Sequence, residues 1–186
     1  MPVEIRALTP DDHRAIEQIA QFCTHAFRTI APDYMTTVEE AREEIAESFA
    51  DDRISRVAVD GDSNTAIGWI GGILTYEPFA WELHPLAVDP GYQGHGIGRA
   101  LAADLETQVK ARGGLTIYLG SDDELGLTSL HGIDLYPNPL EHLARIQNLK
   151  RHPYEFYQKC GFVFTGIVPD ANGFGKPDLL MAKRVG

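Results

Sequence analysis

The segment at residues 89–101, DPGYQGHGIGRAL, places glycines at three alternate positions, Gly94, Gly96 and Gly98, ahead of a helix-like stretch. An apolar, strand-like run, WELHPLAV at residues 81–88, comes directly before it. A strand that enters a glycine-rich turn and then a helix exposes backbone N–H groups at the positive end of the helix dipole. This order of elements predicts an anion site at the turn.

The usual nucleotide-binding fingerprints are absent from this turn. GHGIGR at residues 94–99 reads G-x-G-x-G rather than G-x-G-x-x-G, and the chain contains no G-x-x-x-x-G-K-[ST]. The chain also does not start with the strand–helix–strand unit that carries the dinucleotide fingerprint. Judged on the glycines alone, a tight turn without a ligand is the simpler interpretation.

Pro85 changes that interpretation because it lies inside the preceding strand. Proline has no N–H to donate, so a central strand must bulge there or separate from one neighbour. Backbone groups left unpaired beside Leu86, Ala87 and Val88 can bind an extended ligand as a strand would. The pattern predicts a long ligand whose pyrophosphate lies on the glycine turn.

Strand-like and helix-like segments alternate along the chain, without an internal repeat or a low-complexity linker. Thr9 and Thr37 are the expected N-caps of two early helices, the second with Glu40 in capping-box spacing. Strands are expected at residues 3–8, 54–60, 65–76, 81–88, 115–120, 162–168 and 178–185, and later helices at 99–112 and 153–160. The fold class is therefore mixed α/β.

Length and charge limit the partners. The 186 residues fit a single domain spanning residues 1–186, and the net charge of −11 argues against nucleic acid and favours a cationic partner. No segment has the length of a membrane span and the N-terminus lacks a signal-peptide pattern, so we expect a cytoplasmic protein without membrane contact. The two cysteines, Cys23 and Cys160, have no metal-binding spacing, and we expect no metal site.

Two motifs resemble one enzyme family. QGHGIG at residues 93–98 matches the Q/R-x-x-G-x-G/A signature of the acetyl-CoA-dependent GNAT N-acetyltransferases, and EFYQKCGF at residues 155–162 resembles their second signature, F-Y-x-K-x-G-F. More narrowly, WELHPLAV, GGLTIYLGSDD, IQNLKRHPYEFYQKCGF and DANGFGKPDLLMAKR look like the aminoglycoside 6′-N-acetyltransferases of bacteria. The first 75 residues contain none of the stretches that carry this resemblance.

The resemblance implies a GNAT fold, in which a mostly antiparallel central sheet is splayed at its fourth strand and flanked by helices. It also implies acetyl-CoA as co-substrate, a cationic aminoglycoside as acceptor and a homodimer. The pantetheine arm would pair with residues 86–88, and the pyrophosphate would lie on residues 94–99. The implied acetyl-CoA-binding residues are Leu86, Ala87, Val88, Gln93, Gly94, His95, Gly96, Ile97, Gly98, Arg99 and Tyr157.

Acetyl transfer sets three chemical tasks. The oxyanion needs a fixed donor, for which the backbone N–H of Leu86 beside the bulge is the nearest candidate. The leaving thiolate needs an acid, which by resemblance is Tyr157. The ammonium of the acceptor must lose a proton, and Glu82 is the first candidate and His84 the second. The two-residue period of a strand predicts that Glu82, His84 and Leu86 share one side.

Two interpretations of Glu82 stay open, since a carboxylate stabilises a neighbouring ammonium. Glu82 takes the proton itself, or Glu82 orients the amine and the proton passes through water.

Asp122 and Asp123 follow a strand and are the expected substrate-binding acids, together with Glu82. The alternatives are an acetyltransferase for another polyamine or a protein amine, and a coenzyme-binding module without catalysis. Neither cysteine has a plausible base beside it in any motif, which argues against a mechanism with a cysteine nucleophile. Direct transfer in a ternary complex is therefore favoured.

Overall fold

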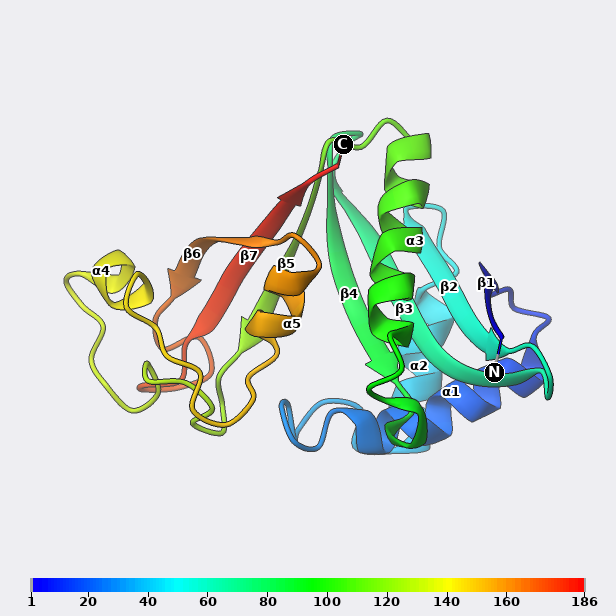
Figure 1. Ribbon diagram of the computed structural model, residues 1–186, viewed down its shortest axis with the longest axis horizontal. Helices are drawn as coiled ribbons and strands as arrows, with labels where there is room; N and C mark the ends of the chain where they lie inside the picture. Colours follow the sequence, from blue (N-terminus) through cyan, green and yellow to red (C-terminus); the bar gives the residue numbers. More distant parts are fainter. Residues whose placement is uncertain (1, 186) are drawn as a thin grey trace. The chain divides into compact units, whose positions relative to one another are not determined.

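The computed structural model describes residues 2–185, which divide into two compact units (Figure 1). The first contains residues 2–28, 32–117 and 185, and the second contains residues 29–31 and 118–184. The expectation of a single domain over residues 1–186 stays a prediction.

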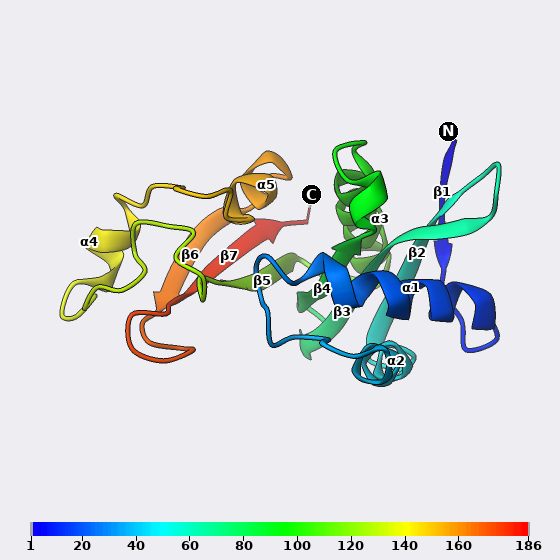
Figure 2. The same ribbon diagram turned by 90° about the horizontal axis from the view of Figure 1, so that it is seen from below.

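The first unit is an antiparallel sheet with helices on both faces. Strands β1 (Val3–Ala7), β2 (Arg53–Asp60), β3 (Thr65–Tyr76) and β4 (Ala80–Val88) pair in that order. Helices α1 (His13–Ala26) and α2 (Val38–Glu47) cover one face, and α3 (Ile97–Ala111) covers the other (Figure 2). A short 3-10 helix, η1 (Pro90–Tyr92), lies between β4 and α3.

Close packing of α3 on β3 explains two of the glycines in β3. A Cβ atom at Gly68 or Gly72 would lie 2.9 Å from a methyl group of Leu101 or Leu105, respectively. Both leucines are completely buried, as their helical spacing predicts. Each contributes about 1.5–3 kcal/mol through burial. A side chain at either glycine would force the leucine methyl group to move.

The first helix begins later than expected. Its N-cap is Asp12 and not Thr9. The Asp12 carboxylate does not cap the helix but accepts hydrogen bonds from Arg6 Nη1 at 2.8 Å and from Thr9 N at 2.9 Å. These bonds lower the pKa of Asp12. The second N-cap is confirmed, since Thr37 Oγ1 accepts the N–H of Glu40 at 3.2 Å.

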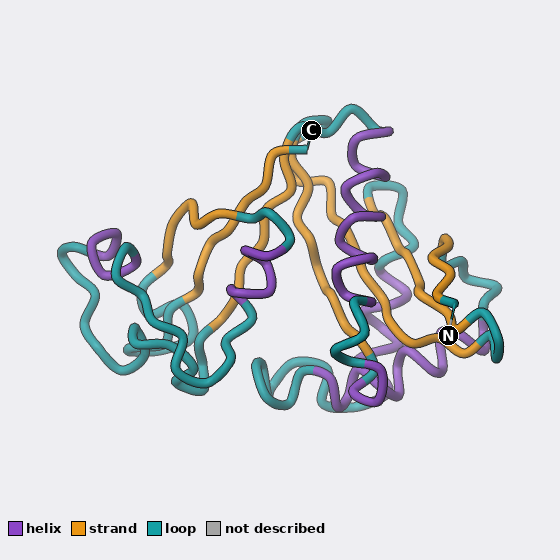
Figure 3. Tube along the Cα trace, in the orientation of Figure 1, coloured by secondary structure: helices purple, strands orange, loops and turns teal. Residues whose placement is uncertain are grey.

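The second unit contains three neighbouring strands in the order β5-β7-β6 and two short helices. Its elements are β5 (Thr116–Asp122, which begins in the first unit), α4 (Pro139–Leu143), α5 (Tyr154–Lys159), β6 (Val163–Val168) and β7 (Asp178–Arg184). The chain between β5 and α5 is mostly loop (Figure 3), as expected. The mixed α/β class with mostly antiparallel strands is confirmed.

Strand β4 carries a bulge at Pro85, which confirms the prediction from the proline. The two pairs that flank the bulge are Ile70 with Leu86 and Gly72 with Leu83. Gly71 alone therefore faces two residues, His84 and Pro85. A Cβ atom at Gly71 would overlap the carbonyl oxygen of His84. Only glycine leaves room for the bulged backbone.

The bulge overturns one expectation from the sequence. Because Ile70 and Gly72 are two residues apart on β3, their partners Leu86 and Leu83 lie on one face of the sheet. Glu82 and His84 alternate with Leu83, so their side chains lie on the opposite face from Leu86. The two-residue period fails here because the bulge inserts an extra residue.

The bulge yields a prediction for stability. Gly71→Ala should lower the free energy of unfolding by about 2 kcal/mol, because its Cβ overlaps backbone atoms that cannot move aside. Gly166→Ala is the matched control, since its Cβ would lie at an ordinary 3.5 Å from Leu180 Cδ1. Urea unfolding of both variants measures the difference. Equal stability would show that the backbone at His84 is not held against Gly71.

Candidate active site

The glycine turn between η1 and α3 has a backbone conformation that requires glycine at two positions. Gly94 and Gly96 have φ angles of 81° and 83°, in the left-handed region that L residues rarely adopt. No atom lies within 4 Å of the Cβ position at either residue. The turn therefore borders open space rather than packed side chains, and a ligand can approach its backbone.

The N-terminus of α3 has the features of an anion site. Gly96 is its N-cap, no side chain caps it, and its first turn contains no acidic residue. The helix's first hydrogen bond runs from the N–H of Ala100 to the carbonyl of Gly96 at 3.0 Å. The N–H groups of the first turn precede that bond and are available to a phosphate. The buried side chain of Ile97 anchors the turn.

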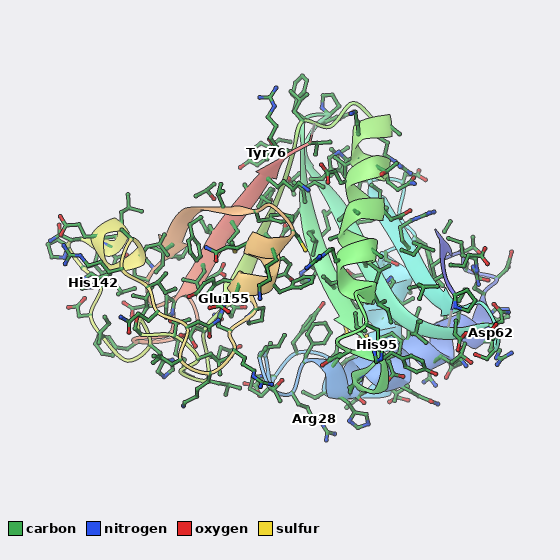
Figure 4. All side chains as sticks on the ribbon, viewed as in Figure 1. Arg28, Asp62, Tyr76, His95, His142 and Glu155 are labelled. Atoms are coloured by element: carbon green, nitrogen blue, oxygen red, sulfur yellow. The ribbon has the colours of Figure 1, made fainter. Side chains whose placement is uncertain are left out.

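Two side chains of the signature hold the turn itself. Gln93 Nε2 donates to the carbonyl of Val88 at 3.2 Å, which ties the turn to the end of β4. His95 Nδ1 lies 3.2 Å from the carbonyl oxygen of Tyr92 and 3.0 Å from that of Gln93. Since carbonyls only accept, Nδ1 must carry a proton. His95 lies at the N-terminal end of α3 (Figure 4).

The predicted residues of β4 lie in the first unit, together with the glycine turn. Leu86 and Val88 are half-buried and Ala87 is buried. On the other face, His84 Nε2 lies 3.1 Å from the hydroxyl of Tyr34 and 3.6 Å from Glu44 Oε1. Glu82, also half-buried, lies on that face as well.

Tyr157, in the second unit, is held by the C-terminal cap of α5. The N–H of Phe162 donates to the carbonyl of Tyr157 at 3.0 Å, and the N–H of Gly161 donates to that of Gln158 at 2.9 Å. These bonds and the φ of 92° at Gly161 define a Schellman motif. The Phe162 and Tyr157 rings meet edge to face with centroids 5.8 Å apart. The second signature is thus a cap that fixes the tyrosine.

The environment of Tyr157 keeps its phenol protonated. Burial raises the pKa of its phenol, and the neighbouring Cys160 thiol raises it further. The hydroxyl therefore keeps its proton at neutral pH, as a proton donor to a thiolate must.

Asp123 does not fit the role of a substrate-binding residue. Its carboxylate is completely buried and accepts hydrogen bonds from the N–H of Leu127 at 2.7 Å and from the N–H and hydroxyl of Thr128 at 2.9 and 2.6 Å. These donors stabilise the loop after β5. The substrate-binding prediction for Asp123 is corrected accordingly. Asp122, which is half-buried and accepts a hydrogen bond from Asn172 Nδ2, stays a prediction.

His152 connects this loop to α5. Its Nδ1 accepts the N–H of Tyr154 at 3.1 Å, and its Nε2 donates to the carbonyl of Asp122 at 3.1 Å. Both bonds require the neutral ring, because a proton on Nδ1 would face the donor at Tyr154. Burial lowers the pKa of His152.

Residues 2–185 contain no cluster of three or more His, Cys, Asp or Glu side chains arranged to hold a metal ion. Within the same described range, no helix is both long and apolar enough to cross a membrane. The sequence predictions missed Tyr34 and did not distinguish Glu44 from the other glutamates of its helix. Tyr34 lies in a loop without a motif, and Glu44 is one of several glutamates on α2.

Comparison with known proteins gives two consistent results. Residues 15–133 match the model of the acetyltransferase (GNAT) family. The solved structure of an aminoglycoside 6′-N-acetyltransferase complexed with coenzyme A is 38% identical, covers 98% of this chain and 97% of its own, and superposes with a TM-score of 0.88.

Two further solved structures are similar over the same length, each covering 98% of this chain and 97% of its own. The aminoglycoside 6′-N-acetyltransferase from Enterococcus faecium is 37% identical with a TM-score of 0.88, and an aminoglycoside 6′-acetyltransferase type Ii is 32% identical with a TM-score of 0.73. The comparison with curated protein sequences gives no match.

His152 predicts a pH dependence of stability. Its pKa is lowered in the folded chain, so the stability that neutral His152 contributes is complete above its unfolded pKa of ~6.5 and is lost as the pH falls towards the folded value. His152→Gln should therefore lose less stability than wild type between pH 7 and pH 5 in urea unfolding. The exposed His13→Gln is the control. An unchanged pH dependence in His152→Gln would contradict the assignment.

Proposed function

Because the chain belongs to the GNAT acetyltransferase family, we propose that it transfers the acetyl group of acetyl-CoA to the 6′-amine of an aminoglycoside. The observation that carries this proposal is similarity at 38% identity over 98% of the chain to an aminoglycoside 6′-N-acetyltransferase. The amine attacks the thioester directly in a ternary complex. Acetylation removes a positive charge from the antibiotic and confers resistance.

The glycine turn and β4 form the proposed acetyl-CoA site. The N–H groups of residues 94–99 bind the pyrophosphate, which the open space at Gly94 and Gly96 supports. The pantetheine arm pairs with the backbone of residues 86–88. Gln93 and His95 act by holding the turn in shape through their bonds to backbone carbonyls.

The bulge supplies the proposed oxyanion donor. The N–H of Leu86 follows Pro85, where the β3–β4 ladder shifts register. A backbone N–H is fixed by the sheet and needs no reorganisation when negative charge develops on the carbonyl oxygen. The N–H lies in the plane of the sheet, so the side-chain face of Leu86 does not matter for this role.

The acid–base roles are divided between two side chains of β4 and one of α5. Tyr157 protonates the sulfur of coenzyme A as it leaves, since its phenol carries the proton that this role needs. Glu82 binds the ammonium and receives its proton directly or through water, with His84 as the second candidate. Since both lie on the α1–α2 face of the sheet, the amine approaches from that face.

Charge supports a polycationic acceptor. The net charge of −11 attracts cations over a distance, and α2 adds two acidic side chains near His84 and Tyr34, namely Glu44 and Glu47. We propose Asp122 as a further contact to the substrate.

By resemblance to the family, we also propose that the protein is a homodimer and lies in the cytoplasm.

The decisive experiment compares two acceptors that differ at one atom. Release of free coenzyme A should be fast with an aminoglycoside that has a 6′-amine and at least ~10-fold lower in kcat/KM with its 6′-hydroxy analogue. Equal rates would contradict the proposed regiochemistry. Activity confined to a linear polyamine or a peptide amine would favour the alternative acceptor classes.

Variants in the same assay test the assigned roles. Tyr157→Phe and Glu82→Ala should each lower kcat by about 10²-fold, which is the usual range for loss of a general acid or base. Tyr136→Phe is the control for the tyrosine, since Tyr136 is an exposed tyrosine of the same unit. If both site variants stay within a factor of about two of wild type, the roles are wrong.

A further inference from the structure

A small cluster of polar side chains meets His84 on the α1–α2 face of the first unit. Its members come from three elements: Tyr34 from the loop between α1 and α2, Glu44 from α2, and His84 from β4. Tyr34 and Glu44 both approach the same ring nitrogen, Nε2, with their oxygens at 3.1 and 3.6 Å. No sequence motif includes Tyr34 or Glu44.

The position of Tyr34 is fixed by packing. Its ring meets Phe27 edge to face with centroids 5.0 Å apart, and lies 5.6 Å from the His84 ring. Phe27 is buried and continues the apolar face of α1. The hydroxyl of Tyr34 is thus held against His84 by the core rather than by a flexible surface contact.

The charges around this cluster decide which groups exchange protons. Burial raises the pKa of Tyr34, as do Glu44, Cys23 and Glu47, so its phenol keeps its proton. Burial likewise raises the pKa of the Cys23 thiol, with Glu44 adding to the effect. Two carboxylates of α2, those of Glu44 and Glu47, act on Tyr34, and Glu82 lies on the same face of β4 as His84. Tyr34 and Cys23 therefore both stay neutral.

We propose that Tyr34 and Glu44 are positioning residues that keep the proton of neutral His84 on Nε2, and so make Nδ1 the atom that accepts a proton from the substrate amine. A carboxylate attracts an N–H proton, and a phenol oxygen can accept one. The second nitrogen of a neutral imidazole is then unprotonated. The proposal rests on the proposed acetyl transfer and names His84, rather than Glu82 alone, as the first proton acceptor.

The protons balance in this scheme. The ammonium gives one proton to Nδ1, and the imidazolium that forms is paired with Glu44. The freed amine attacks the thioester carbonyl, the C–S bond breaks, and the nitrogen loses a second proton. Water takes up that second proton and returns one to Tyr157, which has given its own proton to the sulfur. His84 returns its proton to water, so each cycle releases one proton in total.

The first test measures the tautomer directly and does not depend on activity. In the protein labelled with ¹⁵N-histidine, long-range ¹H–¹⁵N spectra should show His84 as the Nε2–H form, with its signal assigned by its loss in His84→Gln. Glu44→Gln should increase the Nδ1–H form. Glu43→Gln, an exposed neighbour on the same helix with the same change in charge, should not. A Nδ1–H form in wild type would overturn the proposal.

The second test is kinetic. Glu44→Gln and Tyr34→Phe should lower kcat about tenfold while leaving KM for acetyl-CoA unchanged, and Glu43→Gln should match wild type. If wild type is active and Glu44→Gln has the same kcat as Glu43→Gln, the inference is overturned. If wild type acetylates no 6′-amine, the proposed function fails, while the tautomer spectra still report on Tyr34 and Glu44.

Discussion

The contact between Gly71 and the bulged backbone at His84 and Pro85 is the constraint on which the site depends. Because Gly71 has no side chain, β4 can insert an extra residue while it stays paired with β3 on both sides of the bulge. That residue sends the side chains of Glu82 and His84 to one face and that of Leu86 to the other. In our proposal, this separates the backbone donor at Leu86 from the side chains that receive the proton of the amine.

The helices complete this arrangement through ordinary packing. Leu101 and Leu105 hold α3 against glycines of β3, which fixes where the helix begins and where its first N–H groups lie. On the other face, Phe27 and the buried residues of α1 hold the loop that carries Tyr34. In our proposal the acetyl donor binds at the N-terminus of α3, and the acceptor approaches over α2.

The features that could be predicted from sequence are those with a local cause. Pro85 predicted the bulge, the capping-box spacing predicted the start of α2, and the glycines predicted the turn before α3. What failed depended on contacts distant in sequence. The Asp12 carboxylate bonds to Arg6 on β1 and not to the helix that it precedes, and the Asp123 carboxylate accepts its hydrogen bonds from its own loop. Tyr34 has no spacing relation to His84, so only the folded chain brings them together.

The central claim is that backbone N–H groups of the bulge and the glycine turn bind acetyl-CoA. Amide NMR of the uniformly ¹⁵N-labelled chain tests it most directly. On addition of acetyl-CoA, we expect the largest shifts and the strongest slowing of hydrogen exchange at the amides of Leu86 and of Gly94, Gly96 and Gly98. Saturable binding that leaves these four amides unchanged would contradict the account.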